Sequence, residues 1–360
     1  MNMYTLLMAV VLVLAPLMCG SKRGNQQYIW LSCVLMFVVM GLRDMSSIGI
    51  DSSSIYGRLF REYGVLPWSE MPSFQNGDSW AYFWFMRLLY NITGGSYQAA
   101  YAIFAAIELA IFAQFLCKYS PSPVQSIVYF WGLMLFINIF DTMRQGLAMS
   151  ILLLAFDAVM EKKPIRFLLL TLLAAQFHSP ALIFIAAYPI SKMKTNQGYL
   201  IFLAAMLILT YLFRSQILEL MLSFYDTTIY EYDMNFLGNK VLIMIVIVVA
   251  AMVLHPPTKD DRVYNILLQF MGIAIVIQTF ASYNNTFERL ANYYFQFAVV
   301  FIPMVFQLDR PRSRVLDSKS EYLVKQIAPW LFGAFGVWRF ASYIQSNAWI
   351  WLPYRFFFQA

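Results

Sequence analysis

The sequence predicts an all-α integral membrane protein with many transmembrane helices. Of its 360 residues, 61% are hydrophobic and 12% are charged, whereas soluble domains average ~45–50% apolar and ~25% charged residues. Apolar stretches of about 15 to 20 residues recur along the chain, and such lengths cross or nearly cross a ~30 Å hydrocarbon core. The short-period alternation of transmembrane strands is absent. We therefore expect about 10–12 transmembrane helices and a short-helix hairpin in a single transmembrane domain, residues 1–360.

Ten apolar stretches are candidate spans. We interpret residues 3–19 as a retained first span, because neither a basic segment nor a small-residue cleavage site marks a signal peptide. The other candidate spans are 28–42, 97–117, 124–140, 145–160, 198–213, 237–254, 263–281, 290–306 and 326–343.

Three segments between these spans have a different character. Residues 43–96 form the largest external loop, and WAYFWFMRLLYNI at 80–92 has the aromatic, amphipathic pattern of an interfacial helix. Residues 165–190 are two apolar halves separated by HSP at 178–180. Each half covers only ~20 Å as a helix, so we expect a broken helical hairpin with its tip at membrane depth. Residues 214–236 form a second external loop.

The distribution of lysine and arginine predicts the orientation. Basic residues concentrate in cytoplasmic loops of membrane proteins. Fifteen of the 25 basic residues, including nine of the ten lysines, fall in alternate loops of this chain, at 20–27, 118–123, 161–166, 191–197, 255–262 and 307–325. We assign these loops to the cytoplasm and the intervening loops to the outside.

The remaining basic residues lie on or near the outer side, and all but one are arginine. They are Arg43, Arg58, Arg61, Arg87, Arg144, Arg214, Lys240, Arg289, Arg339 and Arg355. A guanidinium group binds phosphate or carboxylate in a planar, bidentate manner. The external face is therefore predicted to carry an anion site built from several loops. No basic run with interleaved aromatic residues occurs, so we expect no nucleic acid partner.

The stretch FDTMRQGLAM at 140–149 places Asp141 and Arg144 between apolar segments. Three residues apart on a helix, they share one face, and an ion pair between them is sterically available. The pair could simply neutralise a span boundary. Alternatively, Arg144 faces a cavity and Asp141 orients it or transfers a proton, because ionisable groups at membrane depth usually mark functional sites.

Two further groups belong to the outer side. His178 lies at the tip of the predicted hairpin, where it could act as a general base near neutral pH, bind a phosphate, or only bond a backbone carbonyl. Glu288 and Arg289 begin an outer span in FERLANYYF, where a snorkelling arginine beside an aromatic belt is the simpler interpretation. The second histidine, His255, falls in the cytoplasmic HPPTKDD loop, where we expect a solvated side chain.

The stretch GLRDMSSIGID contributes Arg43, Asp44 and Asp51 directly after a span, and loop charges of this kind are ordinarily solvated. Taken together, however, charged residues from five places in the chain map to one side of the membrane: Arg43, Asp51, Asp141, Arg144, His178, Glu288 and Arg289. Phosphate-binding loops, nucleophile elbows and metal-ligand motifs are missing. We expect no metal site and no cofactor.

Four stretches read together resemble the EpsG family, a branch of the Wzy-like polymerases of bacterial surface polysaccharides. They are GLRDMSSIGIDSSSIY, FDTMRQGLAMSILLLAF, KKPIRFLLLTLLAAQFHSPAL and ERLANYYF. The resemblance implies polymerisation of undecaprenyl-pyrophosphate-linked oligosaccharide repeat units into capsule, exopolysaccharide or O-antigen glycan. It implies a metal-independent glycosyltransferase in the bacterial inner membrane, with its active site facing the exterior. The fold that the resemblance suggests is similar to that of the GT-C class of membrane glycosyltransferases.

The resemblance also gives the candidate residues roles. The candidate catalytic residues are His178, Arg144, Asp141, Glu288 and Asp51. The candidate substrate-binding residues are Arg43, Arg289, Gln145, Tyr56, Arg214 and Tyr293. Arg144 and Arg289 would bind the pyrophosphate and stabilise the charge that develops on it. His178 would accept a proton from the acceptor hydroxyl or orient that hydroxyl.

Two alternatives stay open at this point. A lipid-linked glycan ligase, or another membrane glycosyltransferase, would use the same donor with a different acceptor. A transporter or flippase would use the arginines only to recognise the pyrophosphate, although the spans at 198–213, 237–254 and 263–281 contain little ionisable character. The expected partners are the lipid bilayer and the lipid-linked oligosaccharides, with a chain-length regulator and a flippase as candidate protein partners.

Overall fold

The regular structure of the protein is helical. The computed structural model describes residues 2–49, 51, 55–71, 80–223, 239–258, 260–281, 285–308, 313 and 315–359. Over these residues it contains eighteen α-helices, and an isolated bridge between Arg43 and Phe356 is the only strand-like pairing in the described ranges. The prediction of an all-α polytopic membrane protein is confirmed.

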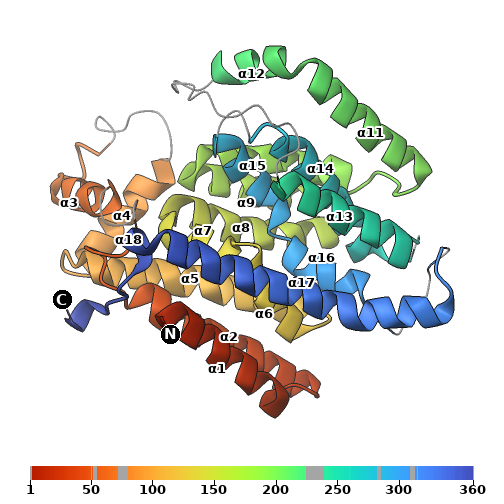
Figure 1. Ribbon diagram of the computed structural model, residues 1–360. Coiled ribbons are helices and arrows are strands. Elements are labelled where there is room, and N and C mark those ends of the chain that lie inside the picture. Colours follow the sequence, from red (N-terminus) through yellow and green to blue (C-terminus); the bar gives the residue numbers. More distant parts are fainter. Residues whose placement is uncertain are drawn as a thin grey trace. The chain divides into compact units, whose positions relative to one another are not determined.

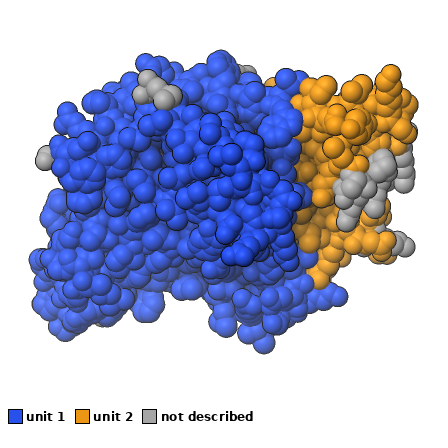
Figure 2. Space-filling view, turned by 90° about the horizontal axis from the view of Figure 1, so that it is seen from below, with its two compact units in different colours: residues 1–182, 330–360 blue, residues 183–329 orange. Residues whose placement is uncertain are grey.

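The chain divides into two compact units, shown in separate colours in Figure 2. Unit 1 comprises residues 1–182 and 330–360, and unit 2 comprises residues 183–329. This division assigns the predicted site residues to two groups. Arg43, Asp51, Tyr56, Asp141, Arg144, Gln145 and His178 belong to unit 1. Arg214, Glu288, Arg289 and Tyr293 belong to unit 2.

Helices α2 (Lys22–Gly41), α5 (Tyr97–Tyr119), α8 (Met143–Met160) and α9 (Pro164–Phe177) pack together at the centre of unit 1. Its other α-helices before the unit boundary are α1 (Met3–Met18), α3 (Gly57–Val65), α4 (Trp80–Ile92), α6 (Pro123–Gly132) and α7 (Leu135–Asp141). Helix α8 packs against both α9 and α5, and α2 packs along α5 (Figure 1). Helix α4 covers parts of α9 and α5 and carries α3.

The remaining helices include those of unit 2. A 3-10 helix, η2 (Ser179–Ala186), is followed directly by α10 (Ala187–Ile190). The next helices along the chain are α11 (Gln197–Leu212), α12 (Arg214–Ser223), α13 (Asn239–Leu254), α14 (Arg262–Gln278), α15 (Asn285–Phe295) and α16 (Ala298–Val305). Helix α17 (Ser318–Ser346) begins in unit 2 and ends in unit 1, where α18 (Ala348–Trp351) and η3 (Phe357–Gln359) follow. Helix α14 packs against α15, α13 and α16.

Several helix starts follow directly from local sequence. The Ser21 side chain accepts a hydrogen bond from the Gly24 N–H at the start of α2, and Ser96 accepts one from the Ala99 N–H at the start of α5. Such side chains satisfy backbone donors that have no partner inside the helix. Pro164 stands in the first turn of α9, where its missing N–H costs nothing.

Fewer helices have the length and composition of a full span than the sequence predicts. Among the described residues, α5 and α8 meet that criterion, and α6 with α7 would make a third span if the bent pair is counted as one. The expected number was about 10–12. Several other apolar helices contain only 10–17 residues, and 16 residues of helix cover only ~24 Å. Helices α5 and α8 confirm the spans predicted at 97–117 and 145–160.

Two breaks correct the predicted helices around residue 140. The span predicted at 124–140 is not one straight helix, because α6 and α7 meet at 61° and Met134 between them is left-handed with φ 65°. The chain breaks again at Thr142, which separates α7 from α8. Asp141 and Arg144 therefore do not lie on one continuous helical face, as the i, i+3 argument assumed.

The outward surfaces of the helices are strongly apolar. Val13 and Leu17 on α1 are 66% and 76% exposed, Ile201 on α11 is 70% exposed, and Leu331 on α17 is 66% exposed. Large aliphatic side chains exposed at this level are expected where hydrocarbon, rather than water, surrounds a protein.

His255 corrects one expectation for the cytoplasmic loops. Its side chain is fully buried in unit 2, where it stacks on Tyr264 with a centroid distance of 4.2 Å. Its Nδ1 lies 3.1 Å from the Met304 carbonyl oxygen and its Nε2 lies 3.3 Å from Asp261 Oδ2. The prediction of a solvated loop histidine is wrong, since the ring ties the start of α14 to the end of α16.

Candidate functional site

The junction between α7 and α8 positions the central charged residues. Helix α7 ends at Asp141, and Arg144 stands in the first turn of α8. Between them, the Thr142 hydroxyl donates to the Asn138 carbonyl and does not cap α8. The start of an 18-residue helix presents backbone N–H groups and a partial positive charge. An anion bound at this helix end would also be close to the base of the Arg144 side chain.

Arg144 links α8 to the end of α9. Its Nε donates a hydrogen bond of 3.2 Å to the Phe177 carbonyl, and its guanidinium carbon lies 5.2 Å from the centroid of the buried Tyr82 ring. The Phe177 carbonyl is part of the peptide bond to His178, the half-buried residue that ends α9 in an extended conformation. Arg144 therefore binds the peptide group that joins Phe177 to His178.

The segment after α2, which we predicted to be the first external loop, reaches the same junction. The backbone N–H of Asp51 donates to Asp141 Oδ2 over 3.4 Å, and both residues are half-buried. Tyr56 is 8% exposed and packs edge-on against the Tyr82 ring, with centroids 6.1 Å apart. Residues separated by about 90 positions, which the sequence could group only by side of the membrane, meet in unit 1.

Arg43, a candidate substrate-binding residue, is not the solvated loop charge that was its alternative interpretation. It is fully buried, with its guanidinium carbon 3.8 Å from the Phe140 ring centroid and 4.7 Å from that of Tyr101. Its Nε lies 3.4 Å from Met45 Sδ, while Nη1 and Nη2 have no hydrogen-bond partner within the described structure. Cation–π contacts of this kind stabilise a desolvated guanidinium. Aromatic side chains of α5 and α7 cover Arg43, so the alternative of a solvated loop charge does not hold. Its role in substrate binding stays a prediction.

Glu108 is a charged residue that the sequence reasoning missed. It lies in the middle of α5, is 1% exposed, and its two carboxyl oxygens have no hydrogen-bond partner in the described structure. It interacts electrostatically with Arg43. A Cβ added at Gly146 would lie 2.6 Å from Glu108 Oε1, so the carboxyl packs directly against α8 beside the buried Gln145. A lone carboxylate inside a candidate span was the available signal.

Asp44 anchors the start of the segment that follows α2. Its carboxylate accepts hydrogen bonds from the Ser46 N–H and from the Ser46 and Ser47 hydroxyls, at 2.6 to 3.0 Å. Burial opposes ionisation, but these hydrogen bonds and the nearby Arg355 outweigh it and hold the pKa of Asp44 below its ordinary value of 3.8. The Asp44 N–H also donates to the Arg355 carbonyl. Both the side chain and the backbone of Asp44 therefore hold the residue next to Arg43 in place.

The family of the chain is decided by a match to a family model. The model of the EpsG family matches residues 28–356, which is nearly the whole chain. The chain belongs to the EpsG family. Searches of curated proteins and of solved structures return no match. Family membership confirms the resemblance drawn from the four sequence stretches, and it makes the chain a polysaccharide-polymerase-like membrane protein.

The other predicted site residues of this EpsG-family protein lie in unit 2. Lys240 donates hydrogen bonds of 2.8 Å to Glu288 Oε1 and 2.9 Å to Asn292 Oδ1. Arg289, the next residue, is exposed, and Tyr293 is fully buried. Lys240, the one lysine predicted to lie on the outer side, therefore holds the ERLANYYF helix, and Glu288 is its counter-charge.

Arg214 begins α12 and contacts the end of α11. Its Nη1 lies 3.5 Å from the Tyr211 carbonyl oxygen, and its guanidinium carbon lies 4.7 Å from the centroid of the Tyr211 ring. Most of the second external loop, residues 224–238, lies outside the described residues. Within the described ranges, no cluster of three or more His, Cys, Asp or Glu residues is suited to hold a metal ion.

Proposed function

We propose that this EpsG-family protein polymerises undecaprenyl-pyrophosphate-linked oligosaccharide repeat units at the outer face of the bacterial inner membrane. One observation carries the proposal: Arg144, in the first turn of α8, bonds the carbonyl of the peptide that leads into His178. A fixed cation, a helix N-terminus and a candidate base thus share one small region of unit 1. The products would be capsule, exopolysaccharide or O-antigen glycan.

In this proposal the start of α8 binds the pyrophosphate of the donor. The guanidinium of Arg144, which the Phe177 carbonyl and the Tyr82 ring orient, would bind the phosphate oxygens of the donor. Backbone N–H groups of the helix start add to this anion site. Arg43, buried behind Phe140, would contribute positive potential without direct contact.

The reaction then needs only displacement at the anomeric carbon. The acceptor hydroxyl oxygen forms a bond to that carbon while the bond to the pyrophosphate oxygen breaks, and the hydroxyl proton passes to a base. His178 is the proposed base, and Asp141 and Asp51 are the competing candidates from the same unit. Because pyrophosphate is already an activated leaving group whose charge Arg144 would stabilise, we propose that the reaction needs no metal ion.

Reconstitution with purified components tests the proposal. Purified protein in sealed liposomes would receive lipid-linked repeat units, without nucleotide sugar or added metal, and the products would be separated on a gel. A ladder of regularly spaced products is the expected result. Transfer of a single unit to a different acceptor would identify a ligase, and unchanged substrate that has crossed the bilayer would identify a transporter. Either result would replace the proposal.

A further inference from the structure

A second polar site lies at the other end of unit 1. A cavity of about 550 Å³ opens between the start of α2 and the end of α5. Its lining residues are Lys22, Gln26, Trp30, Gln114, Cys117 and Lys118. The lining residues of α5 lie 17 to 21 positions after Tyr97, so at ~1.5 Å per residue this cavity is about 26–32 Å along the helix from the Tyr97 end near α8.

The lining residues are arranged as two helical stripes. Lys22, Gln26 and Trp30 are four residues apart on α2, and Gln114 and Lys118 are four apart on α5, so each set lies on one helix face. The two stripes face each other across the seam where α2 packs on α5. Ammonium and amide groups thus converge from both helices, and among the described residues no carboxylate lines the cavity.

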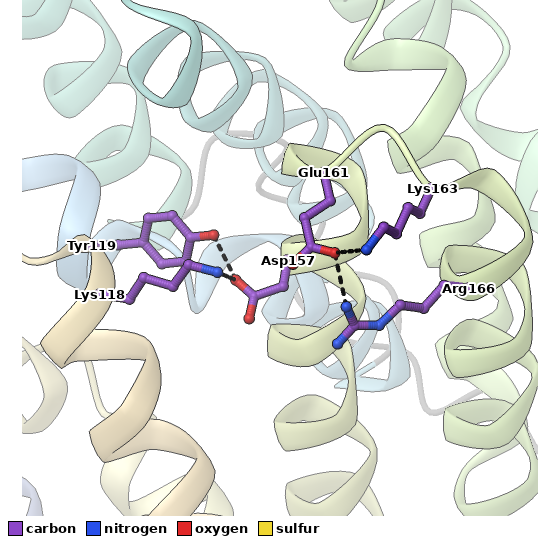
Figure 3. A network of polar contacts seen from close by, with 6 residues as sticks. All are labelled: Lys118, Tyr119, Asp157, Glu161, Lys163 and Arg166. Carbon is purple, nitrogen blue, oxygen red and sulfur yellow. Dashed lines mark hydrogen bonds and ion pairs between the residues drawn. The ribbon is translucent and has the colours of Figure 1, made fainter.

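The neighbouring carboxylates are already engaged (Figure 3). Asp157 accepts hydrogen bonds from Lys118 Nζ at 2.8 Å and from the Tyr119 hydroxyl at 2.5 Å. Glu161 bonds Lys163 and Arg166 at 2.9 Å each, and the Lys163 hydrogen bond holds the pKa of Glu161 below its ordinary value. This end of unit 1 carries six basic side chains against those two carboxylates, at Lys22, Arg23, Lys118, Lys162, Lys163 and Arg166.

We propose that this cavity binds the phosphate headgroup of an anionic phospholipid. Lys22 supplies a full positive charge, and Lys118 supplies an ammonium group that it shares with Asp157. Gln26 and Gln114 supply amide donors for the phosphate oxygens. The predicted topology places this end in the cytoplasmic leaflet, where basic pockets between helices bind anionic lipids. This site is independent of the polymerase proposal.

The surroundings favour a lipid over free phosphate. Trp30 is 40% exposed beside the cavity, which suits an aromatic residue at the level of the lipid headgroups. One turn further along α2, Val34 is 52% exposed. A diacyl lipid whose headgroup enters the cavity could therefore lay its chains along this apolar face, whereas inorganic phosphate gains nothing from it.

Cys117 provides a direct probe because it lines the cavity. The protein carrying the substitution Cys19→Ser would be reconstituted in nanodiscs of phosphatidylcholine alone or with phosphatidylglycerol, and alkylation of Cys117 by a maleimide would be followed by mass spectrometry. Cys33, which is 3% exposed, serves as the unreactive internal control. Phosphatidylglycerol is expected to slow the alkylation of Cys117 several-fold, and millimolar inorganic phosphate in phosphatidylcholine nanodiscs is expected to have no effect.

Two variants separate a specific site from a diffuse basic surface. Lys22→Gln is expected to weaken the protection roughly fivefold, because losing one direct hydrogen bond to the phosphate costs about 1 kcal/mol. The matched control, Arg23→Gln, removes the same charge from the next residue, which does not line the cavity, and should retain the protection. Equal alkylation in both lipids, equal effects of the two variants, or protection by inorganic phosphate would each overturn the proposal.

Discussion

Arg144 in unit 1 and Arg289 in unit 2 looked equivalent in the sequence, but the structure places them in different environments. Arg144 is half-buried and fixed by the Phe177 carbonyl and the Tyr82 ring, which come from two other helices. Arg289 is exposed on α15, and the polar contacts beside it are centred on Lys240 and Glu288. An arginine that is held in place before the substrate arrives binds with less loss of side-chain entropy.

The difference indicates which of the two arginines contributes more to the reaction. A group stabilises a transition state most effectively when it is oriented in advance and shielded from water. Arg144 meets both conditions, because its neighbours are the buried Tyr82 and the end of α9. We therefore expect unit 1 to carry the chemistry, and we expect Arg289 to assist substrate binding.

The largest expected effect follows from removing Arg144. Arg144→Ala should lower polymerisation ~10²–10³-fold, the usual cost of losing one oriented donor to a developing negative charge, while the protein remains inserted. Arg144→Lys should fail almost as badly, because an ammonium group cannot replace the planar guanidinium contacts. The rate of ladder formation with purified lipid-linked repeat units measures both variants.

Arg289→Ala is the matched comparison for that prediction. Its effect should stay within about tenfold and should appear at low donor concentration, as expected for an exposed binding residue. If Arg289→Ala is as damaging as Arg144→Ala, the distinction between the two units is wrong.

The sequence predicted the structural features that depend on neighbouring residues. It did not predict those that depend on contacts between residues far apart in the chain. Apolar stretches gave α5 and α8 nearly to the residue, because helix length and hydrophobicity are local properties. The helix break at Thr142 could not be predicted, because neither proline nor glycine occurs at that position or beside it. The burial of Arg43 depends on Tyr101 and Phe140, which are far along the chain.

The candidate site shows the same limit. Charge and position grouped Asp51, Asp141, Arg144 and His178 on one side of the membrane, and the structure brings these four together within unit 1. No sequence signal linked Arg144 to the carbonyl before His178, because that contact depends on how α8 packs on α9. Glu108 was overlooked because an isolated carboxylate has no motif around it.

A second prediction sharpens the account of unit 1 through Gly146. The Cβ of Gly146→Ala would lie 2.6 Å from Glu108 Oε1 and 3.2 Å from Ile139 Cβ. Because Glu108 is fully buried, it has little room to move, and we expect a loss of about 1–3 kcal/mol of stability, as for other overpacked cores. Thermal unfolding of the purified variant, followed by intrinsic fluorescence, measures the effect.

Adding Glu108→Ala to Gly146→Ala supplies the control. Removal of the carboxylate relieves the contact, so the double variant should be more stable than the sum of the two single effects predicts. Simple additivity would show that Glu108 does not pack against Gly146 in the way described.

A third, smaller effect is expected in unit 2 from Lys240→Met. The Lys240 side chain is 13% exposed and that of Glu288 is 42% exposed, so water screens part of their attraction. The melting temperature should fall by at most about 2–4 °C, and the polymerisation rate should change much less than in Arg144→Ala. A loss of activity comparable to that of Arg144→Ala would move the chemistry towards unit 2.

The smallest effect concerns Asp44 and appears only in acid. Its pKa in the folded protein lies below 3.8, so the ionised carboxylate stabilises the fold fully above its unfolded pKa. That contribution is lost as the pH falls through the folded pKa. Asp44→Asn should lower stability at neutral pH, because the amide nitrogen cannot accept the hydrogen bond from the Ser47 hydroxyl. It should also weaken the dependence of stability on pH below about 4.

Unfolding measured between pH 6 and pH 3 tests this prediction. Asp317→Asn is the control for an exposed carboxylate whose pKa is also lowered, by hydrogen bonds from Ser320. An unchanged pH profile for Asp44→Asn would mean that the segment holding Arg43 is fixed by its backbone contacts to the C-terminal residues alone.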